Sequence, residues 1–149
     1  ITSLPELPDG LTELDCGQTL ITSLPELPDG LTALVCHNVQ LTSLPELPDE
    51  LMELYCDSTQ ITAIPKLPKG LITLHCSYTK ITALPELPTT LMNLFCDSTH
   101  INWLPELPDG LKELDCRDTP FANDLRAISI LKHQNPELVI TYDTPEYEI

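Results

Sequence analysis

Six cysteines are the side chains of this chain that could do most chemistry, and each closes one copy of a short repeated phrase. They are Cys16, Cys36, Cys56, Cys76, Cys96 and Cys116. Cysteines of neighbouring parallel strands would have Cβ atoms near the strand spacing of about 4.8 Å, whereas a disulfide prefers about 3.8 Å. Zinc needs ligands that converge tetrahedrally, and a straight row of thiols offers none. The pattern therefore favours neither a disulfide framework nor a metal site.

A histidine beside a thiol could activate it as a nucleophile. His37 and His75 lie next to Cys36 and Cys76 in the sequence. Successive residues of a strand point to opposite faces, so we expect the imidazoles to face away from the thiols. The sequence also has no glycine-rich phosphate loop, serine nucleophile motif or metal-binding helix. We predict no catalytic residue, no cofactor and no metal.

The simplest role for the six cysteines is a buried ladder of small apolar side chains. Free thiols in such a ladder indicate a reducing intracellular compartment. No signal peptide is visible, although the sequence starts in the middle of a repeat at Ile1.

The elements that position these residues follow from a repeat of 20 residues without insertion or deletion. A constant short period predicts a solenoid, in which each turn buries its apolar face against the next. Leu14 and Cys16 alternate with Asp15, which predicts a short strand with the leucine and the cysteine inward. Pro25 and Pro28 fix the backbone and remove hydrogen-bond donors, so their segment should be an extended, polyproline-like convex side.

We assign residues 1–120 to the solenoid and residues 121–149 to a C-terminal cap with an acidic tail. Asn123 is the expected helix N-cap. The helix would present an apolar face of Leu125, Ile128, Ile130 and Leu131, and Pro136 would end it. Residues 138–142 are rich in β-branched side chains and predict a final strand, and residues 143–149 should be loose.

Charge narrows the possible partners. The chain has 23 acidic and 7 basic residues and a formal charge of −16. Nucleic acid and anionic membranes need a cationic surface, so neither is an expected partner. Basic proteins, cations or plain solubility remain as explanations.

The outward positions of the strands vary inside this regular frame, and they are the candidate binding residues. The position between the inward leucine and the cysteine holds Val35, Tyr55, His75 and Phe95 in the central repeats. The positions on either side of it hold Glu53, Asp57, Asn93 and Asp97. Aromatic side chains on a rigid surface are typical binding anchors, although variation at tolerant surface positions would give the same pattern.

The repeats resemble the leucine-rich repeat family. Their length and the phrase Leu-Pro-x-Leu-Pro are similar to the short subclass found in secreted effectors of enteropathogenic bacteria, and similar cysteine-bearing arrays occur in giant viruses of amoebae. The resemblance implies a right-handed superhelix with a parallel concave sheet. At the position where the family usually has Asn, this chain has Thr19, Val39, Thr59, Thr79, Thr99 and Thr119. The helical N-terminal cap and the ubiquitin-ligase domain of some effectors are not seen in this sequence, so ligase activity is not implied.

The leading interpretation is a non-enzymatic protein-binding module whose concave face binds a protein or peptide of basic and apolar character. The alternative is a structural protein that stacks with itself or with a scaffold. A repeat fragment of a secreted effector is the third possibility.

Overall fold

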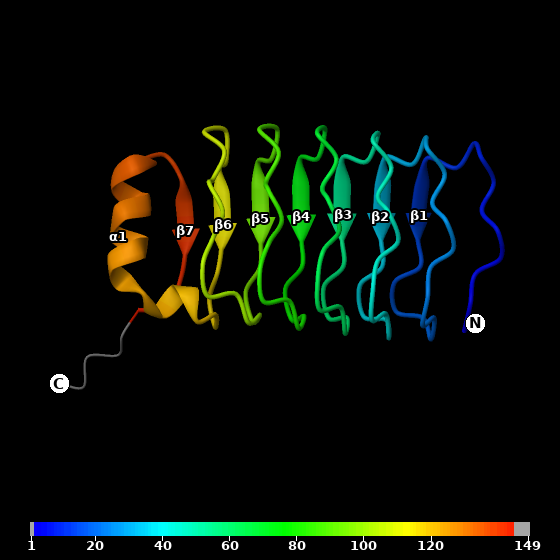
Figure 1. Cartoon of the computed structure of the whole chain (residues 1–149), viewed down its shortest axis with the longest axis horizontal. Coiled ribbons are helices and arrows are strands. Elements are labelled where there is room, and N and C mark those ends of the chain that lie inside the picture. Colours follow the sequence, from blue (N-terminus) through cyan, green and yellow to red (C-terminus); the bar gives the residue numbers. More distant parts are fainter. Residues whose placement is uncertain (1, 145–149) are drawn as a thin grey trace.

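The computed structural model describes residues 2–144 and is a solenoid with seven parallel strands (Figure 1). The strands are β1 Glu13–Asp15, β2 Ala33–Val35, β3 Glu53–Tyr55, β4 Thr73–His75, β5 Asn93–Phe95, β6 Glu113–Asp115 and β7 Val139–Thr141. They pair in sequence order, and β1 to β6 keep a constant register in which Leu14 lies opposite Leu34 and Leu34 opposite Leu54. The predicted parallel sheet is confirmed.

The core lies between the sheet and the extended side. The middle leucine of the central strands and the cysteine after it are fully buried, as in Leu54 and Cys56. The Leu-Pro-x-Leu-Pro segments contain no helix or strand, and their second leucine, for example Leu47 or Leu67, is buried. Glu26 and its equivalents are exposed. The inward side chains of the strands and the second leucines of the proline segments thus fill one core from opposite sides.

The return to each strand is a tight turn. The Leu31 N–H donates to the Pro28 carbonyl oxygen at 3.1 Å, and equivalent bonds recur in every turn. The glycine before that leucine has no positive φ. This explains why Glu50 and Thr90 can replace it.

Positive φ occurs two residues after each cysteine instead. The residues are Gln18, Asn38, Ser58, Tyr78, Ser98 and Asp118, with φ between 52° and 56°. The following threonine hydroxyl donates to the cysteine carbonyl, at 2.9 Å for Thr59 and 2.8 Å for Thr79. Val39 has no hydroxyl group and cannot make this bond.

Among these six residues, Tyr78 is the least suited to a positive φ. A bulky side chain in the left-handed region is strained by about 1 kcal/mol, whereas asparagine tolerates it. We expect Tyr78→Asn to raise the free energy of unfolding by about 0.5–1 kcal/mol in urea titrations. Tyr78→Val is the control and should lower it, because a β-branched residue is worse still at positive φ. A destabilised Tyr78→Asn variant would contradict the assignment of strain.

The C-terminal cap consists of a 3-10 turn η1 Phe121–Asn123, the helix α1 Leu125–Gln134 and β7. The helix and the strand confirm the predicted order. The N-cap prediction is wrong: Asp124, not Asn123, accepts the N–H of Ala127, at 3.0 Å. Asn123 lies in the 3-10 turn, and its amide reaches back to the Thr119 carbonyl at 3.4 Å.

The apolar face of α1 is narrower than expected. Ile128 is buried and Leu131 is half-buried, but Leu125 and Ile130 are exposed. The helix rests against one end of the solenoid, so only one strip of it is covered. Residues 145–149 of the predicted acidic tail lie outside the described residues. Within residues 2–144, no helix is long and apolar enough to span a membrane.

Candidate functional site

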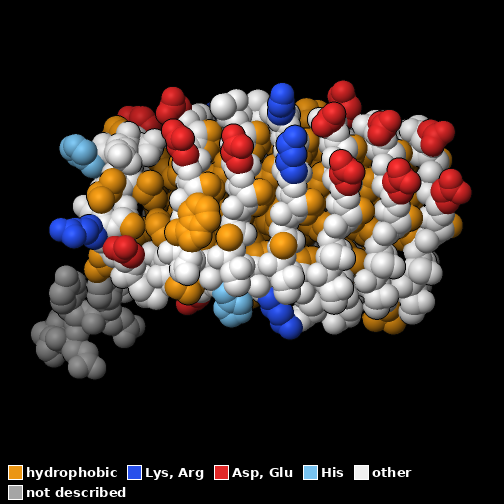
Figure 2. Space-filling model, in the orientation of Figure 1, with side chains coloured by type: hydrophobic (Ala, Val, Ile, Leu, Met, Phe, Trp, Pro, Cys, Tyr) orange, Lys and Arg blue, Asp and Glu red, His pale blue; other side chains and the backbone are white. Residues whose placement is uncertain are grey.

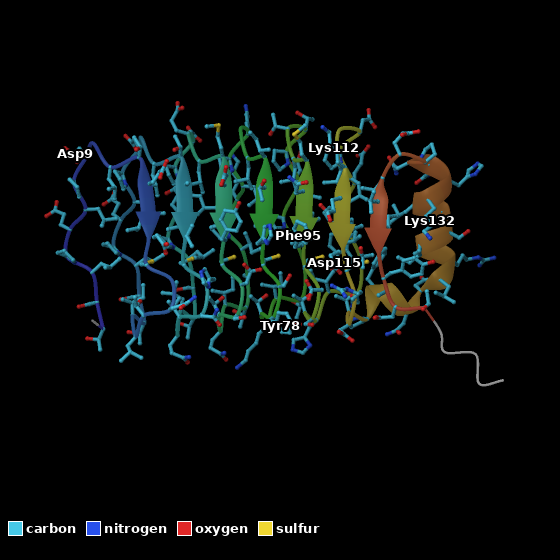
Figure 3. All side chains as sticks on the ribbon, turned by 180° about the vertical axis from the view of Figure 1, so that it is seen from behind. Asp9, Tyr78, Phe95, Lys112, Asp115 and Lys132 are labelled. Atoms are coloured by element: carbon cyan, nitrogen blue, oxygen red, sulfur yellow. The ribbon has the colours of Figure 1, made fainter. Side chains whose placement is uncertain are left out.

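The outward side of the sheet, the predicted concave face, carries the predicted column of Val35, Tyr55, His75 and Phe95. Each is the last residue of its strand, and the strand register places each beside the next. Phe95 lies over the middle of the sheet in the view from behind (Figure 3). All four side chains are half-buried. The sequence therefore predicted the alignment of the column.

The three rings of this column stack on one another. The centroids of Tyr55 and His75 are 4.7 Å apart with the planes tilted by 39°, and those of His75 and Phe95 are 4.2 Å apart at 26°. Ring faces thus meet along the solenoid axis, and the column presents ring edges to solvent. Such pairs contribute about 0.5–1.5 kcal/mol each beyond their buried area, so the column also stabilises the contact between turns.

One side of the column carries Glu53 and Asn93. The Tyr55 hydroxyl donates to Glu53 Oε2 at 3.2 Å, and Glu53 is exposed. Partial burial, and then the negative charge of Glu53, raise the pKa of Tyr55. Asn93 Nδ2 donates to Thr73 Oγ1 at 3.4 Å. These contacts fix the side chains that stand beside the ring edges.

The other side carries Asp57 and Asp97, which are joined through Ser77. The Ser77 N–H donates to Asp57 Oδ1 at 3.1 Å, and the Ser77 hydroxyl donates to Asp97 Oδ1. Asp97 is 9% exposed and Asp57 is half-buried, so neither carboxylate is as exposed as its predicted outward position implies. Burial raises the pKa of Asp57, while His75 and the Ser77 N–H oppose this shift. The sequence gives no sign that Ser77 links the two carboxylates.

The cysteine ladder lies behind the sheet. All six cysteines are free thiols and buried. Several donate to a carbonyl of the following turn, as in Cys56 Sγ to His75 O at 3.3 Å and Cys76 Sγ to Phe95 O at 3.4 Å. Burial raises the pKa of all six thiols, to about 12 for Cys116. A buried, protonated thiol is a poor nucleophile. Among the described residues, no group of three or more His, Cys, Asp or Glu side chains is arranged to hold a metal.

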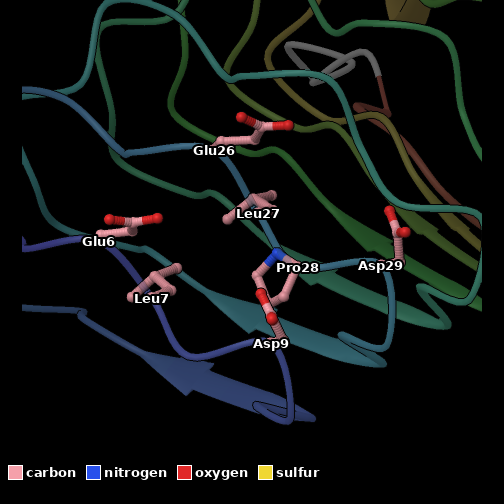
Figure 4. Close-up of a pocket in the computed structure, with 7 residues that line it drawn as sticks. All are labelled: Glu6, Leu7, Asp9, Glu26, Leu27, Pro28 and Asp29. Atoms are coloured by element: carbon pink, nitrogen blue, oxygen red, sulfur yellow. The ribbon is translucent and has the colours of Figure 1, made fainter.

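The opposite side of the solenoid has shallow acidic grooves between its Leu-Pro-x-Leu-Pro segments. One has a volume of about 240 Å³ and is lined by Glu6, Leu7, Asp9, Glu26, Leu27, Pro28 and Asp29 (Figure 4). The carboxylates form rows across the turns, and lysines interrupt these rows (Figure 2). Lys66 and Lys69 stand at the repeat positions that Glu26 and Asp29 hold in their turn, and they line another groove of the same kind.

Comparisons with known proteins agree with this geometry. No protein-family model and no curated protein sequence matches the chain. Among solved structures, it is similar to YopM from Yersinia enterocolitica WA-314, with 30% identity and a TM-score of 0.67 over 79% of this chain and 31% of that protein. It is also similar to YopM from Yersinia pestis, with 25% identity and a TM-score of 0.74 over 95% of this chain and 46% of that protein. A Shigella effector leucine-rich-repeat domain gives 23% identity and a TM-score of 0.69 over 90% of this chain and 82% of that domain.

The fold and its repeat thus define the class: the chain is a leucine-rich-repeat solenoid. Within this class it resembles the repeats of bacterial effector proteins, as the Leu-Pro-x-Leu-Pro phrase predicted. The chain spans less than half the length of the two Yersinia proteins.

Proposed function

We propose that this chain is a non-enzymatic protein-binding module that binds its partner on the concave face of the sheet. The observation that carries the proposal is the column of Val35, Tyr55, His75 and Phe95, whose side chains line up on a rigid surface. Rigid, partly exposed aromatics contribute strongly to protein interfaces. The leucine-rich-repeat fold, which commonly mediates protein binding, supports this class of function.

The expected partner is a protein or peptide with positive charge and apolar side chains. Residues 1–65 contain 11 acidic residues and no Lys or Arg, so the first turns present a strongly negative surface. Opposite charge speeds association and selects partners. Self-assembly through these turns is less favoured, because two copies would bring like charges together. The buried free thiols suit a reducing compartment.

Removing the aromatic edges tests the proposal. We expect the double variant Tyr55→Ala, Phe95→Ala to weaken partner binding at least thirtyfold, since a central interface aromatic contributes about 2 kcal/mol or more. Its stability must be measured first, because the ring stack is lost as well. Affinity is measured by titration with the partner identified in a pull-down with the wild-type protein.

Two further variants make this test independent of the stack. Thr73→Arg adds a long cation to the half-buried position beside the rings and should repel the partner while the rings stay stacked. Trp103→Ala removes a 52% exposed ring outside the concave column and should leave affinity unchanged. If Thr73→Arg binds as tightly as the wild type, the concave face is not the binding site.

A further inference from the structure

We propose that the concave face takes a polyproline II segment with two Arg or Lys residues three positions apart, lying along the solenoid axis and across the strands. The inference rests on the proposed function and adds the backbone conformation and sequence pattern of the partner. It follows from three features of the face: which groups are free to bind, the distance at which they repeat, and where the accessible charges lie.

The sheet leaves no main-chain groups for a ligand on this face. The backbone N–H groups that follow the column bond to the next strand, as in Cys36 N to Tyr55 O and Cys56 N to His75 O, both at 2.8 Å. A bound β-strand would therefore find no ladder to join. A polyproline II segment keeps its backbone solvated and contacts its partner through side chains alone. It is also preformed, so it loses little conformational entropy on binding.

The repeat distance of the face fits the same conformation. Neighbouring strands are about 4.8 Å apart, so equivalent positions two strands apart are separated by about 9.6 Å. Polyproline II has three residues per turn and rises 3.1 Å per residue, which gives about 9.3 Å per turn. Every third ligand residue thus meets an equivalent position on every second strand, with a mismatch of about 0.3 Å. An α-helix, with a pitch of 5.4 Å, would differ from the spacing of single strands by about 0.6 Å per strand, about four times the mismatch of polyproline II per strand.

One pair of carboxylates lies on the face at that distance. Glu13 on β1 and Glu53 on β3 are exposed and aligned in register, with the small side chain of Ala33 on β2 between them. Cations at ligand positions i and i+3 would reach the two carboxylates. The ligand residues between them would pack on the apolar edges of Val35 and Tyr55, which adjoin this row on the same strands. The face therefore selects a basic residue followed by two apolar residues, and proline is the best of these because it fixes the conformation.

The experiment compares two labelled peptides of identical composition, by fluorescence anisotropy with the intact chain at physiological ionic strength. One is four copies of Arg-Pro-Pro, and the other is two copies of Arg-Arg-Pro-Pro-Pro-Pro. Both carry the same charge and adopt polyproline II, so only the three-residue spacing differs. We expect the first to bind about fivefold more tightly, because only it places cations at both carboxylates.

Matched variants locate the effect. Glu53→Gln should remove the preference between the peptides, whereas Glu106→Gln, an exposed carboxylate outside the sheet, should preserve it. Equal affinity for both peptides, or no binding of either, overturns this inference. The proposed function still holds in those cases if Thr73→Arg abolishes binding of the pulled-down partner, and it fails with the inference if that variant binds normally.

Discussion

In reducing buffer, this protein is expected to unfold over a narrow interval at about pH 9.5–10, driven by the cysteine ladder. Each buried thiol stays protonated in the folded state, because burial raises its pKa well above the ordinary value. In the unfolded chain the same thiols ionise at about pH 8.5. Above that pH the folded state binds more protons than the unfolded state, so stability falls as pH rises.

The size of the effect follows from the number of thiols. The stability that each thiol contributes is complete below about pH 8.5, and above it is lost at about 1.4 kcal/mol per pH unit. The five thiols with the most strongly raised pKa, those of Cys36, Cys56, Cys76, Cys96 and Cys116, give up to about 7 kcal/mol per pH unit. A domain stable by about 5–15 kcal/mol loses all of its stability within about two pH units of that slope. The repeat makes the effect large, because successive copies of one sequence position each add a further increment.

Urea titrations by circular dichroism between pH 7 and pH 10 would measure the slope. The double variant Cys56→Ala, Cys76→Ala should be less stable at pH 7 because of its cavities, yet shallower in its pH dependence by about 2.7 kcal/mol per pH unit. Leu54→Ala is the packing control: it should lower stability at every pH and leave the slope unchanged. If the double variant keeps the wild-type slope, ionisation of the ladder is not the cause of alkaline unfolding.

The sequence was sufficient for the fold because each structural constraint recurs. Leu14, Cys16 and Leu27 return at the same spacing in successive turns, and a strand, a proline segment and a tight turn are the only local structures that suit all copies. The parallel sheet and the buried cysteines follow from this repetition. The column on the concave face follows too, since strands without insertions must keep their register.

Features that depend on a single copy were not predictable. The choice of Asp124 over Asn123 as N-cap depends on where the 3-10 turn ends. The link from Ser77 to Asp57 and Asp97 depends on the rotamers of three neighbours. The stacking of Tyr55, His75 and Phe95 on one another also depends on the rotamers of neighbouring side chains. Sequence position gave the alignment of the side chains, but not whether they would point to solvent or rest on each other.

The remaining large effect concerns the cap, and Phe121→Ala is expected to lower the free energy of unfolding by about 3–4 kcal/mol. Phe121 is 7% exposed, and its N–H donates to the Ile101 carbonyl at 3.0 Å. Replacing a buried phenylalanine by alanine typically costs about 3–5 kcal/mol. Ile130→Ala on α1 is the matched control, because a side chain that is 50% exposed should cost well under 1 kcal/mol.

The loss of stability in Phe121→Ala should also be largest near the cap, because each turn of a solenoid is stabilised mainly by its neighbours. The Cys116 N–H bonds to Thr141 O of the cap at 3.0 Å, whereas the Cys56 N–H bonds to β4 in the middle of the sheet. Hydrogen exchange on Phe121→Ala should therefore accelerate more at Cys116 than at Cys56. Uniform acceleration would mean that the solenoid opens only as a whole, and a loss of stability below about 1 kcal/mol would mean that the cap is not needed to hold the last turn. The capping role assigned to residues 121–141 depends on the opposite result at both sites.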